Sequence, residues 1–475
     1  MRPGEHFQTD VPNRLDRLPW SKWHWRVVIG LGVTWVLDGL EVTLAGAIGA
    51  VLTKSLHMSD TQVGMSATFY LIGAVIGAVG FGYATDRLGR KKLFTVTLLV
   101  YLLGTAASGL AWNFWSYSFF RAVTGAGIGG EYAAINSAID ELIPARLRGH
   151  VDLIINATYW FGAAIGASVT IVLLSGTLVS AKLGWRFVFI AGALLGLVII
   201  FIRHYIPESP RWLMTHGQEE EAENVVRQVE EEIQKETGRE LPEPEGEPLT
   251  VRVRYRTPWK EIWNAMAYKH RDRSLLGLSL MISQAFFYNA IFFTYALLLV
   301  KFYGVAAADV GYYLLPFALG NLLGPILIGR LFDTIGRKPM IAGTYAGAGV
   351  LLAITGWLFR AGLLTAHTQT IAWTVIFFVA SCAASSAYLT VSEIFPLEIR
   401  ALAISIFYAT GTLAGGVGAP ALFGDLIQSG SKPELFWGYI FAAALMIGGA
   451  AMEWKLGVPA ERKSLERISA PLSSA

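Results

Sequence analysis

Four charged side chains lie inside long apolar stretches of the 475-residue sequence. Asp38 and Glu41 are three residues apart in the first stretch, so a helix would place both on one face. Arg121 and Glu131 share a later stretch, with a run of glycines between them. A charge inside a segment that crosses a bilayer is costly, and it marks a functional site by default. These four residues are therefore the first candidates for chemistry.

Proton binding is the chemistry that this combination of residues suits. Burial disfavours the ionised form of a carboxyl group, and a neighbouring guanidinium favours it again. A carboxylate whose arginine contact forms and breaks as the protein changes shape would bind and release a proton. We expect Asp38, Glu41, Arg121 and Glu131 to couple proton movement in this way. The alternatives are a fixed ion pair that only joins two helices, and direct contact of Arg121 with a solute.

Uncharged polar side chains inside other apolar stretches form a second group of candidates. They are Asn156, Gln284, Asn289, Asn321 and Tyr388. Amide and hydroxyl groups suit the wall of a cavity that hydrogen-bonds a small polar solute. We expect these five residues to bind substrate. For any single amide, the alternative is a hydrogen bond between helices.

Opposite charges near the expected helix ends form a third group, and they occur twice. The segment Gly82–Lys91 returns as Gly329–Lys338, at an offset of 247, and Glu141–Arg148 returns as Glu393–Arg400, at an offset of 252. We expect these charges to gate the cytoplasmic face, with static bracing of loops as the alternative. The charges are Asp86, Arg90, Glu141, Arg148, Glu208 and Arg211 in the first half, and Asp333, Arg337, Glu393 and Arg400 in the second.

The composition shows what kind of protein must position these residues. Apolar residues make up 54% of the chain and charged residues only 15%, against about 25% in soluble domains. Residues 205–273 hold 26 of the charges. An ordinary soluble enzyme and a disordered chain are both excluded, and an integral membrane protein is indicated. The single cysteine, Cys382, excludes an internal disulfide or a multi-cysteine metal site.

Other partners receive no support from the sequence. The net charge of +3 gives no argument for nucleic acid. No phosphate-binding loop with a Gly-Lys-Ser/Thr ending occurs, and no metal-spaced or hydrolytic cluster is present. We expect no metal, no cofactor and no enzymatic activity. The expected partners are a small-molecule substrate, protons and the lipid bilayer.

Twelve stretches reach the roughly 20 apolar residues that a bilayer-spanning helix needs, six on each side of the charged segment. The sequence predicts an all-α membrane protein of two six-helix pseudo-repeats with a small cytoplasmic helical segment between them. The predicted parts are a tail at 1–26, a bundle at 27–204, a linker at 205–273, a bundle at 274–454 and a tail at 455–475.

Positive charge predicts the orientation. Eighteen Lys and Arg residues lie on the side that carries both tails and only six on the opposite side, which places the tails and the linker in the cytoplasm. Within the linker, apolar residues at helical spacing between Ala222 and Ile233 predict an amphipathic helix, and those between Trp259 and Met266 predict a second one. We expect both to cap the cytoplasmic face, with partner binding as the alternative.

The repeated motifs, together with Pro207–Leu213 and Pro459–Glu466, resemble those of the major facilitator superfamily. The resemblance is strongest to its sugar-porter-type branch, which includes metabolite:proton and aromatic-acid:proton symporters. It implies two bundles that rock about a site between them, a location in the cell membrane, and a monomer.

The resemblance also bears on single residues. Asp38–Glu41 is similar to the acidic first-helix motif of aromatic-acid symporters, and Arg121 matches an arginine that faces a first-helix acid in proton-linked sugar porters. Gln284, Asn289 and Asn321 match the spacing of the sugar-binding amides. Gly411 stands where sugar porters have another amide. The choice between a carboxylate and a sugar stays open.

The function predicted from these observations is secondary active transport of a small polar metabolite, an organic acid or a sugar-like solute, by alternating access with proton symport. The first alternative is a uniporter of the same fold, in which the buried charges are structural. The second is a membrane sensor that binds solute and signals through residues 214–270.

Overall fold

The computed structural model describes residues 6–174, 181–203, 206–254, 257–306 and 309–472. In this part of the chain the secondary structure is almost entirely helical, and nine helices are long and apolar enough to cross a membrane. The predicted boundary at residues 204 and 205 and the extreme ends of both predicted tails lie outside the described residues.

The first half contains six long helices. Local capping explains where two of them begin: the Ser59 hydroxyl accepts from the Gln62 backbone before α4, and Asn113 caps α6 in the same way. A short helix, α3 (Gly49–Ser55), follows the first long one. The long helices are α2 (Lys22–Ala47), α4 (Asp60–Leu88), α5 (Arg90–Gly109), α6 (Phe114–Leu142), α7 (Arg148–Leu174) and α8 (Ala181–Arg203).

The second half repeats this plan with more interruptions. Its helices are α12 (Arg271–Phe292), α13 (Tyr295–Tyr303), α14 (Val310–Ile328), α15 (Leu331–Thr334), α16 (Arg337–Arg360), α17 (Ala366–Ile394), η3 (Leu397–Ile399), α18 (Arg400–Gly411), η4 (Thr412–Gly418), α19 (Ala419–Gln428) and α20 (Lys432–Leu456). The segments α18, η4 and α19 run on as one span. With α12, α14, α16, α17 and α20 they make six spans, so the predicted twelve-helix architecture is confirmed.

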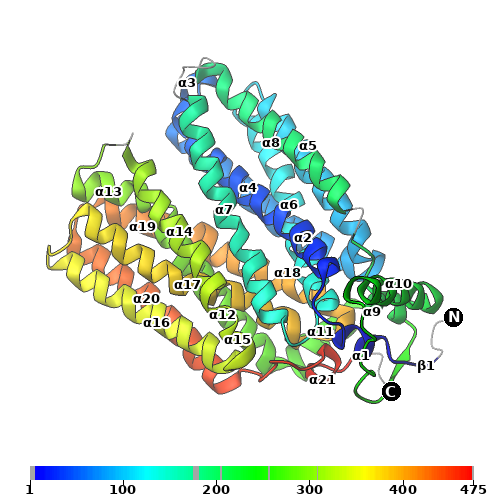
Figure 1. Ribbon diagram of the computed structural model, residues 1–475. Helices are drawn as coiled ribbons and strands as arrows, with labels where there is room; N and C mark the ends of the chain where they lie inside the picture. The colour runs from blue at the N-terminus through cyan, green and yellow to red at the C-terminus, as the bar shows by residue number, and fades with distance from the viewer. Residues whose placement is uncertain (1–5, 175–180, 204–205, 255–256, 307–308, 473–475) are drawn as a thin grey trace.

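Figure 1 shows the two halves as two inclined groups of helices that converge at one end of the molecule. Both termini lie at this end, beside the short helices of the tails and the linker. We call it the basal end, and we call the opposite end, which carries α3 and α13, the distal end.

Glycines allow α4 and α6 to touch backbone to backbone. A Cβ atom added at Gly73 would lie 2.0 Å from the Ala122 carbonyl oxygen, and one at Gly77 would lie 2.0 Å from that of Ala126. Small residues allow such close helix packing in membranes. At Gly80 of the same helix an added Cβ would meet nothing within 4 Å, so this glycine makes no such contact.

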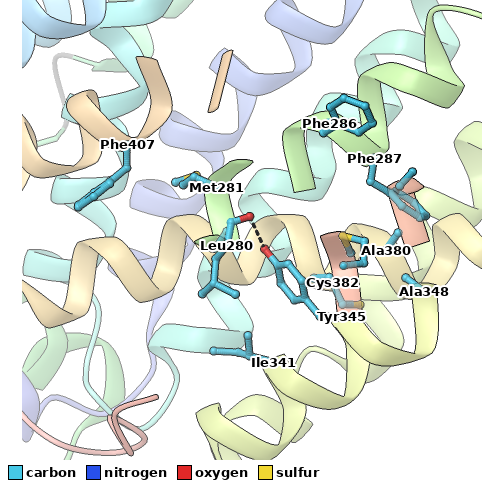
Figure 2. Close-up of a cluster of buried hydrophobic side chains, with 14 of the residues drawn as sticks. Leu280, Met281, Phe286, Phe287, Ile341, Tyr345, Ala348, Ala380, Cys382 and Phe407 are labelled. Carbon is cyan, nitrogen blue, oxygen red and sulfur yellow. Dashed lines mark hydrogen bonds between the residues drawn. The ribbon is translucent and has the colours of Figure 1, made fainter. Parts of the chain in front are cut away.

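The second half has a continuous apolar core. Figure 2 shows side chains of α12, α16, α17 and α18 interlocking, among them Phe287, Tyr345 and Phe407. The Tyr345 hydroxyl donates to the Leu280 carbonyl oxygen at 3.0 Å, which satisfies its polar group within the core. This core gives α12 and α17 a rigid support for the side chains that they turn toward the first half.

The basal end is built from the tails and the linker. Strands β1 (His6–Thr9) and β2 (Leu249–Arg252) pair antiparallel, so the N-terminal tail and the linker share a small sheet that the sequence did not predict. The helices here are α1 (Val11–Asp16), α9 (Pro210–Thr215), α10 (Glu219–Thr237), α11 (Trp259–Asn264), η1 (Ala265–Lys269) and α21 (Leu465–Ile468).

The predicted linker helix is present as α10, and α1 covers it. Apolar side chains of α10, Val226 and Ile233 among them, are buried together with Val11 and Leu15 of α1. The Arg14 guanidinium reinforces the contact with a hydrogen bond of 2.7 Å to Glu230. Burial opposes ionisation of Glu230, but hydrogen bonds from Arg14 and Arg17 outweigh it and lower its pKa.

The second predicted amphipathic segment is helical, but only part of it is buried. Ile262 and Met266 face the protein. Trp259 and Trp263 are 52% and 66% exposed, and the Trp259 ring stacks on Tyr83 of α4 with ring centroids 4.8 Å apart. The segment directly precedes the membrane-spanning α12, where indole rings are favoured at the bilayer interface.

Candidate functional site

A cavity of about 210 Å³ lies between the two halves. The first half contributes lining residues from α2, α4, α6 and α7, and the second half contributes them from α12, α17, α18 and η4. All the lining residues are uncharged. The aromatic members are Trp35, Tyr70, Tyr132, Tyr159, Trp160, Tyr288, Phe292, Phe293, Tyr388 and Tyr408.

The rings of this wall contact one another across the boundary between the halves. Tyr132 of α6 stacks on Tyr408 of α18 with ring centroids 4.6 Å apart. Trp35 of α2 packs edge-on against Tyr132 at 4.4 Å and lies 6.3 Å from Tyr388 of α17. Such contacts hold aromatic rings at defined angles. The wall of the cavity is therefore largely aromatic, and its tyrosines add hydroxyl groups to it.

Four of the five residues predicted to bind substrate line the cavity: Asn156, Gln284, Asn289 and Tyr388. The fifth, Asn321, is buried, and no described contact places it in the cavity wall. Its side-chain oxygen accepts the Tyr288 hydroxyl at 2.7 Å. Asn321 therefore holds a ring of the wall from behind.

The four residues predicted to couple protons are all buried, in α2 and α6. Arg121 donates a hydrogen bond to Glu41, and the two form an ion pair. Asp38, Glu41 and Glu131 all lie within electrostatic range of the Tyr101 hydroxyl of α5. None of the four is among the described cavity-lining residues. The Glu41–Arg121 ion pair is thus a site of its own, distinct from the described cavity wall.

The repeated charges form matching clusters at the basal end of each half. In the first half, Arg90 pairs with Glu141 at 2.9 Å and with Asp86 at 3.2 Å. In the second half, Arg337 pairs with Glu393 at 2.9 Å and with Asp333 at 2.8 Å. The sequence repeat therefore corresponds to a repeat in three dimensions.

The same clusters also join the halves to each other. Arg148 lies 3.5 Å from Glu393 of the other half, and Arg400 lies 3.4 Å from Glu141. Two pairs related by the repeat therefore cross the boundary.

Each loop aspartate caps a helix of the opposite half. The Asp86 carboxylate accepts from the backbone nitrogens of Ala401 and Leu402 at 3.2 and 2.9 Å, at the start of α18. The Asp333 carboxylate accepts from Gly149 and His150 at 3.1 and 2.8 Å, at the start of α7. An anion is favoured at a helix N-terminus. These bonds therefore join the two halves at the basal end.

Glu208 and Arg211 connect the first half to the linker and the tails. Glu208 accepts from the Arg90 backbone nitrogen at 2.9 Å, and burial raises its pKa although such backbone bonds oppose the rise. Arg211 pairs with Asp16 of the N-terminal tail at 3.3 Å and with Glu466 of the C-terminal tail at 3.1 Å. Both tails therefore take part in closing the basal end.

Sequence reasoning missed several residues of these sites. Asp16 and Glu466 were missed because nothing in the sequence shows where a polar tail folds back. Most of the aromatic wall was missed because rings inside apolar stretches resemble lipid-facing ones. A signal for Trp35 was available, since it lies three residues before Asp38 and so shares a helix face with it. Asp152 was also missed; its carboxylate contacts the Asn156 amide at 3.3 Å.

A membrane-spanning chain of two pseudo-symmetric six-helix halves, with a cavity between them that is shut at one end, defines a membrane transporter. The chain belongs to the sugar (and other) transporter family, whose family model matches residues 41–469. The resemblance inferred from the repeated motifs is thereby confirmed.

Relatives of known name point in two chemical directions. The niacin transporter NiaP of Acinetobacter baylyi is 27% identical over 97% of this chain and 99% of its own length. The D-xylose transporter of Levilactobacillus brevis is 26% identical over 90% of this chain and 91% of its own. The structure of the proton:xylose symporter XylE with 6-bromo-6-deoxy-D-glucose superposes with a TM-score of 0.77, at 20% identity and 94% and 98% coverage.

Proposed function

We propose that this protein carries a planar aromatic or heteroaromatic carboxylic acid across the cell membrane together with a proton. The observation that carries the proposal is the aromatic wall of the cavity. Flat faces such as those of Trp35, Tyr132 and Tyr408 bind a flat ring by stacking and edge contacts. The amides of Asn156, Gln284 and Asn289 and the Tyr388 hydroxyl would orient its polar group.

The charge of the cavity supports proton symport of an acid. No described lining residue carries a charge, so nothing in the wall neutralises a bare carboxylate. Moving an uncompensated charge through a bilayer-spanning protein is costly. A monovalent anion and one proton together have no net charge, so their joint transport avoids this cost. The buried Glu41–Arg121 pair beside the cavity supplies a place to hold that proton.

Two of the relatives support this choice. The niacin transporter and the 4-hydroxybenzoate transporter PcaK, both of Acinetobacter baylyi, are named for ring acids. PcaK is 25% identical over 73% of this chain and 74% of its own length.

In the transport cycle, Glu41 would take up the proton when its ion pair with Arg121 breaks. Asp38 and Glu131 would add negative charge near Tyr101. The basal ion pairs would open to let the solute out and close to reset the site. The basal end would face the cytoplasm, in keeping with the excess of Lys and Arg there. One chain would suffice, because the cavity is enclosed by a single chain.

A second candidate is a sugar porter. The observation in its favour is the set of amides on α12, Gln284 and Asn289, both of which line the cavity. The D-xylose transporter among the relatives supports it. The uniporter of the same fold is the third possibility, and it predicts transport without any need for Glu41 to titrate.

The test is uptake into proteoliposomes with an imposed pH gradient, using radiolabelled nicotinate, 4-hydroxybenzoate and D-xylose in parallel. We expect nicotinate or 4-hydroxybenzoate to accumulate when the outside is acidic. The substitution Glu41→Gln should abolish accumulation yet preserve counterflow exchange, since the amide cannot carry a proton. Glu434→Gln, an exposed acid at the start of α20, is the matched control and should behave as wild type.

Each alternative gives a different result. Accumulation of D-xylose alone would select the sugar porter. Equilibration without accumulation, at a rate indifferent to pH, would select the uniporter. If Asp38→Asn and Glu41→Gln together leave proton-driven uptake unchanged, the assignment of the coupling residues is wrong.

A further inference from the structure

Tyr70 of α4 lies between the cavity and the buried ion pair. Its half-buried ring is part of the cavity wall. The guanidinium carbon of Arg121 lies 4.5 Å from the centroid of the same ring, which is a cation–π contact. Among the described lining residues, neither Glu41 nor Arg121 occurs. Tyr70 is therefore in contact with both the cavity and Arg121.

Backbone packing fixes the ring in this position. A Cβ atom added at Gly125 of α6 would lie 2.0 Å from the Tyr70 carbonyl oxygen. Gly73, three residues after Tyr70, makes an equally close contact with the Ala122 carbonyl oxygen. Helices α4 and α6 are thus in backbone contact directly beside the Tyr70–Arg121 contact. The ring cannot move away from Arg121 by a shift of its helix alone.

Other groups around the ion pair complete its electrostatic surroundings. Asp38 of α2 and Tyr408 of α18 lie within range of Tyr70, and Tyr117 of α6 faces Arg121. The ring of Phe189 of α8 lies 5.8 Å from the Arg121 guanidinium carbon. The described groups nearest to Arg121 are thus Glu41 and aromatic rings. A change at one of those rings has few other charges to compensate it.

We propose that Tyr70 is the positioning residue through which a solute in the cavity changes the Arg121–Glu41 pair. The inference rests on the proposed function, since it assumes that Glu41 carries the coupled proton. A solute that packs against the Tyr70 ring in the cavity alters the contact of this ring with Arg121, and so alters how firmly Arg121 holds the Glu41 carboxylate. By thermodynamic linkage, protonation of Glu41 then changes solute affinity by the same factor.

The test compares Tyr70→Phe, which keeps the ring, with Tyr70→Leu, which removes it. The dissociation constant of nicotinate is measured on the purified protein at pH 6 and pH 8. In the wild type we expect at least a fivefold weaker affinity at pH 8. Tyr70→Phe should keep this ratio, and Tyr70→Leu should reduce it to less than twofold. Tyr288→Leu, which removes a wall ring not in described contact with Arg121, should weaken binding at both pH values and keep the ratio.

A second measurement needs no ligand. The infrared carbonyl band of Glu41, identified by its loss in Glu41→Gln, is titrated in each variant. Its midpoint should be the same in the wild type and Tyr70→Phe, and it should shift by at least half a pH unit in Tyr70→Leu. Arg121→Lys gives a further route with Tyr70 intact, because an ammonium stacks on a ring less well than a guanidinium. It should shift the midpoint in the same direction.

Two results would overturn the inference while leaving the proposed function standing. One is a Tyr70→Leu protein that keeps both the affinity ratio and the Glu41 midpoint of the wild type. The other is a Tyr70→Phe protein that loses both, which would assign the effect to the hydroxyl. A wild type whose nicotinate affinity and uptake ignore pH would instead refute the proposed function.

Discussion

The two aspartate caps should set how firmly the basal end closes. Asp86 and Asp333 each accept two backbone hydrogen bonds from a helix of the opposite half, at 2.8 to 3.2 Å. These bonds must break when the halves part, whereas the bonds of each aspartate to its own half can persist. The full free energy of these bonds between the halves therefore stabilises the closed basal end relative to the open one.

The size of the effect follows from charge. A hydrogen bond to an ionised group is worth roughly 1 kcal/mol more than one between neutral groups. The two carboxylate oxygens of each aspartate accept one backbone bond each, and Asn offers only one acceptor oxygen, so Asp→Asn loses one charged bond, worth roughly 2 kcal/mol, and weakens the other by about 1 kcal/mol. A loss of about 3 kcal/mol lowers the closed-to-open ratio about 150-fold for one substitution. Because the two caps lie in different halves of the chain, Asp86→Asn with Asp333→Asn should lose about 6 kcal/mol, or roughly 20,000-fold.

Spin labels measure this ratio directly. Replacing Cys382, the single cysteine, gives a background without thiols. Labels at Arg87 and Thr334, exposed positions of the two loops, report the distance across the basal end by electron–electron double resonance. We expect a longer distance to gain population in each single variant and to dominate in the double variant.

The matched control is Asp425→Asn, an exposed acid of α19 without a described bond across the halves. It should leave the distance distribution unchanged. If the double variant also leaves it unchanged, or moves it toward the closed form, the caps do not hold the basal end and the reasoning fails.

Three further outcomes follow from particular contacts. Gly77→Ala places a Cβ 2.0 Å from a backbone oxygen of α6 and should lower the free energy of unfolding by about 1–3 kcal/mol. Gly80→Ala, which has open space around its Cβ, should leave it unchanged. Thermal unfolding of the two variants in detergent measures the difference. Burial lowers the pKa of His216 to about 4, so the folded state favours the neutral ring. The stability that this ring contributes should be complete above about pH 6.5 and should be lost as the pH falls toward 4. Hydrogen exchange of α9 should detect this loss, and His216→Phe should make the stability of α9 independent of pH in this range. Asn321→Ala and Tyr288→Phe break the same hydrogen bond, so each should weaken nicotinate binding about fivefold. The double variant should bind nicotinate only slightly more weakly than either single variant. If the two losses instead add, Asn321 affects binding independently of Tyr288.

Most of the fold could be predicted because a bilayer makes a simple demand. A helix that crosses it needs a long apolar run, and polar punctuation between such runs is visible in the sequence. The small sheet of β1 and β2 could not be found in this way, because its strands are four residues each and pair across more than 200 positions. The exposure of Trp263 could not be predicted, because the spacing of indole side chains alone does not tell a surface that faces the protein from one that faces the bilayer interface.

The site divides into parts that the sequence specifies and parts that only the fold creates. The repeat predicted that Asp86 and Asp333 play the same part. It could not tell that each caps a helix of the other half, because a repeat gives equivalence and not contact. That Arg121 pairs with Glu41 likewise depends on how α2 faces α6. The sequence could not single out Tyr70, because its importance depends on two contacts in the fold, one with the cavity and one with Arg121.

There is a physical reason for the charged pair Glu41–Arg121 to lie outside the cavity that would hold the solute. If Arg121 lay in the cavity, it would bind a carboxylate tightly in every state, and such uniform binding would slow release. An uncharged wall holds the ring through contacts that can be gained and lost within the cavity, while the charge that must be balanced stays on Glu41 beside it. Tyr70 is the described side chain that joins these two sites, and Asn156 joins the cavity to the buried Asp152 on the path to the basal clusters. In the proposed mechanism, a solute in the cavity would thus act on the Glu41–Arg121 pair through one contact and on the basal clusters through another, as ordered symport requires.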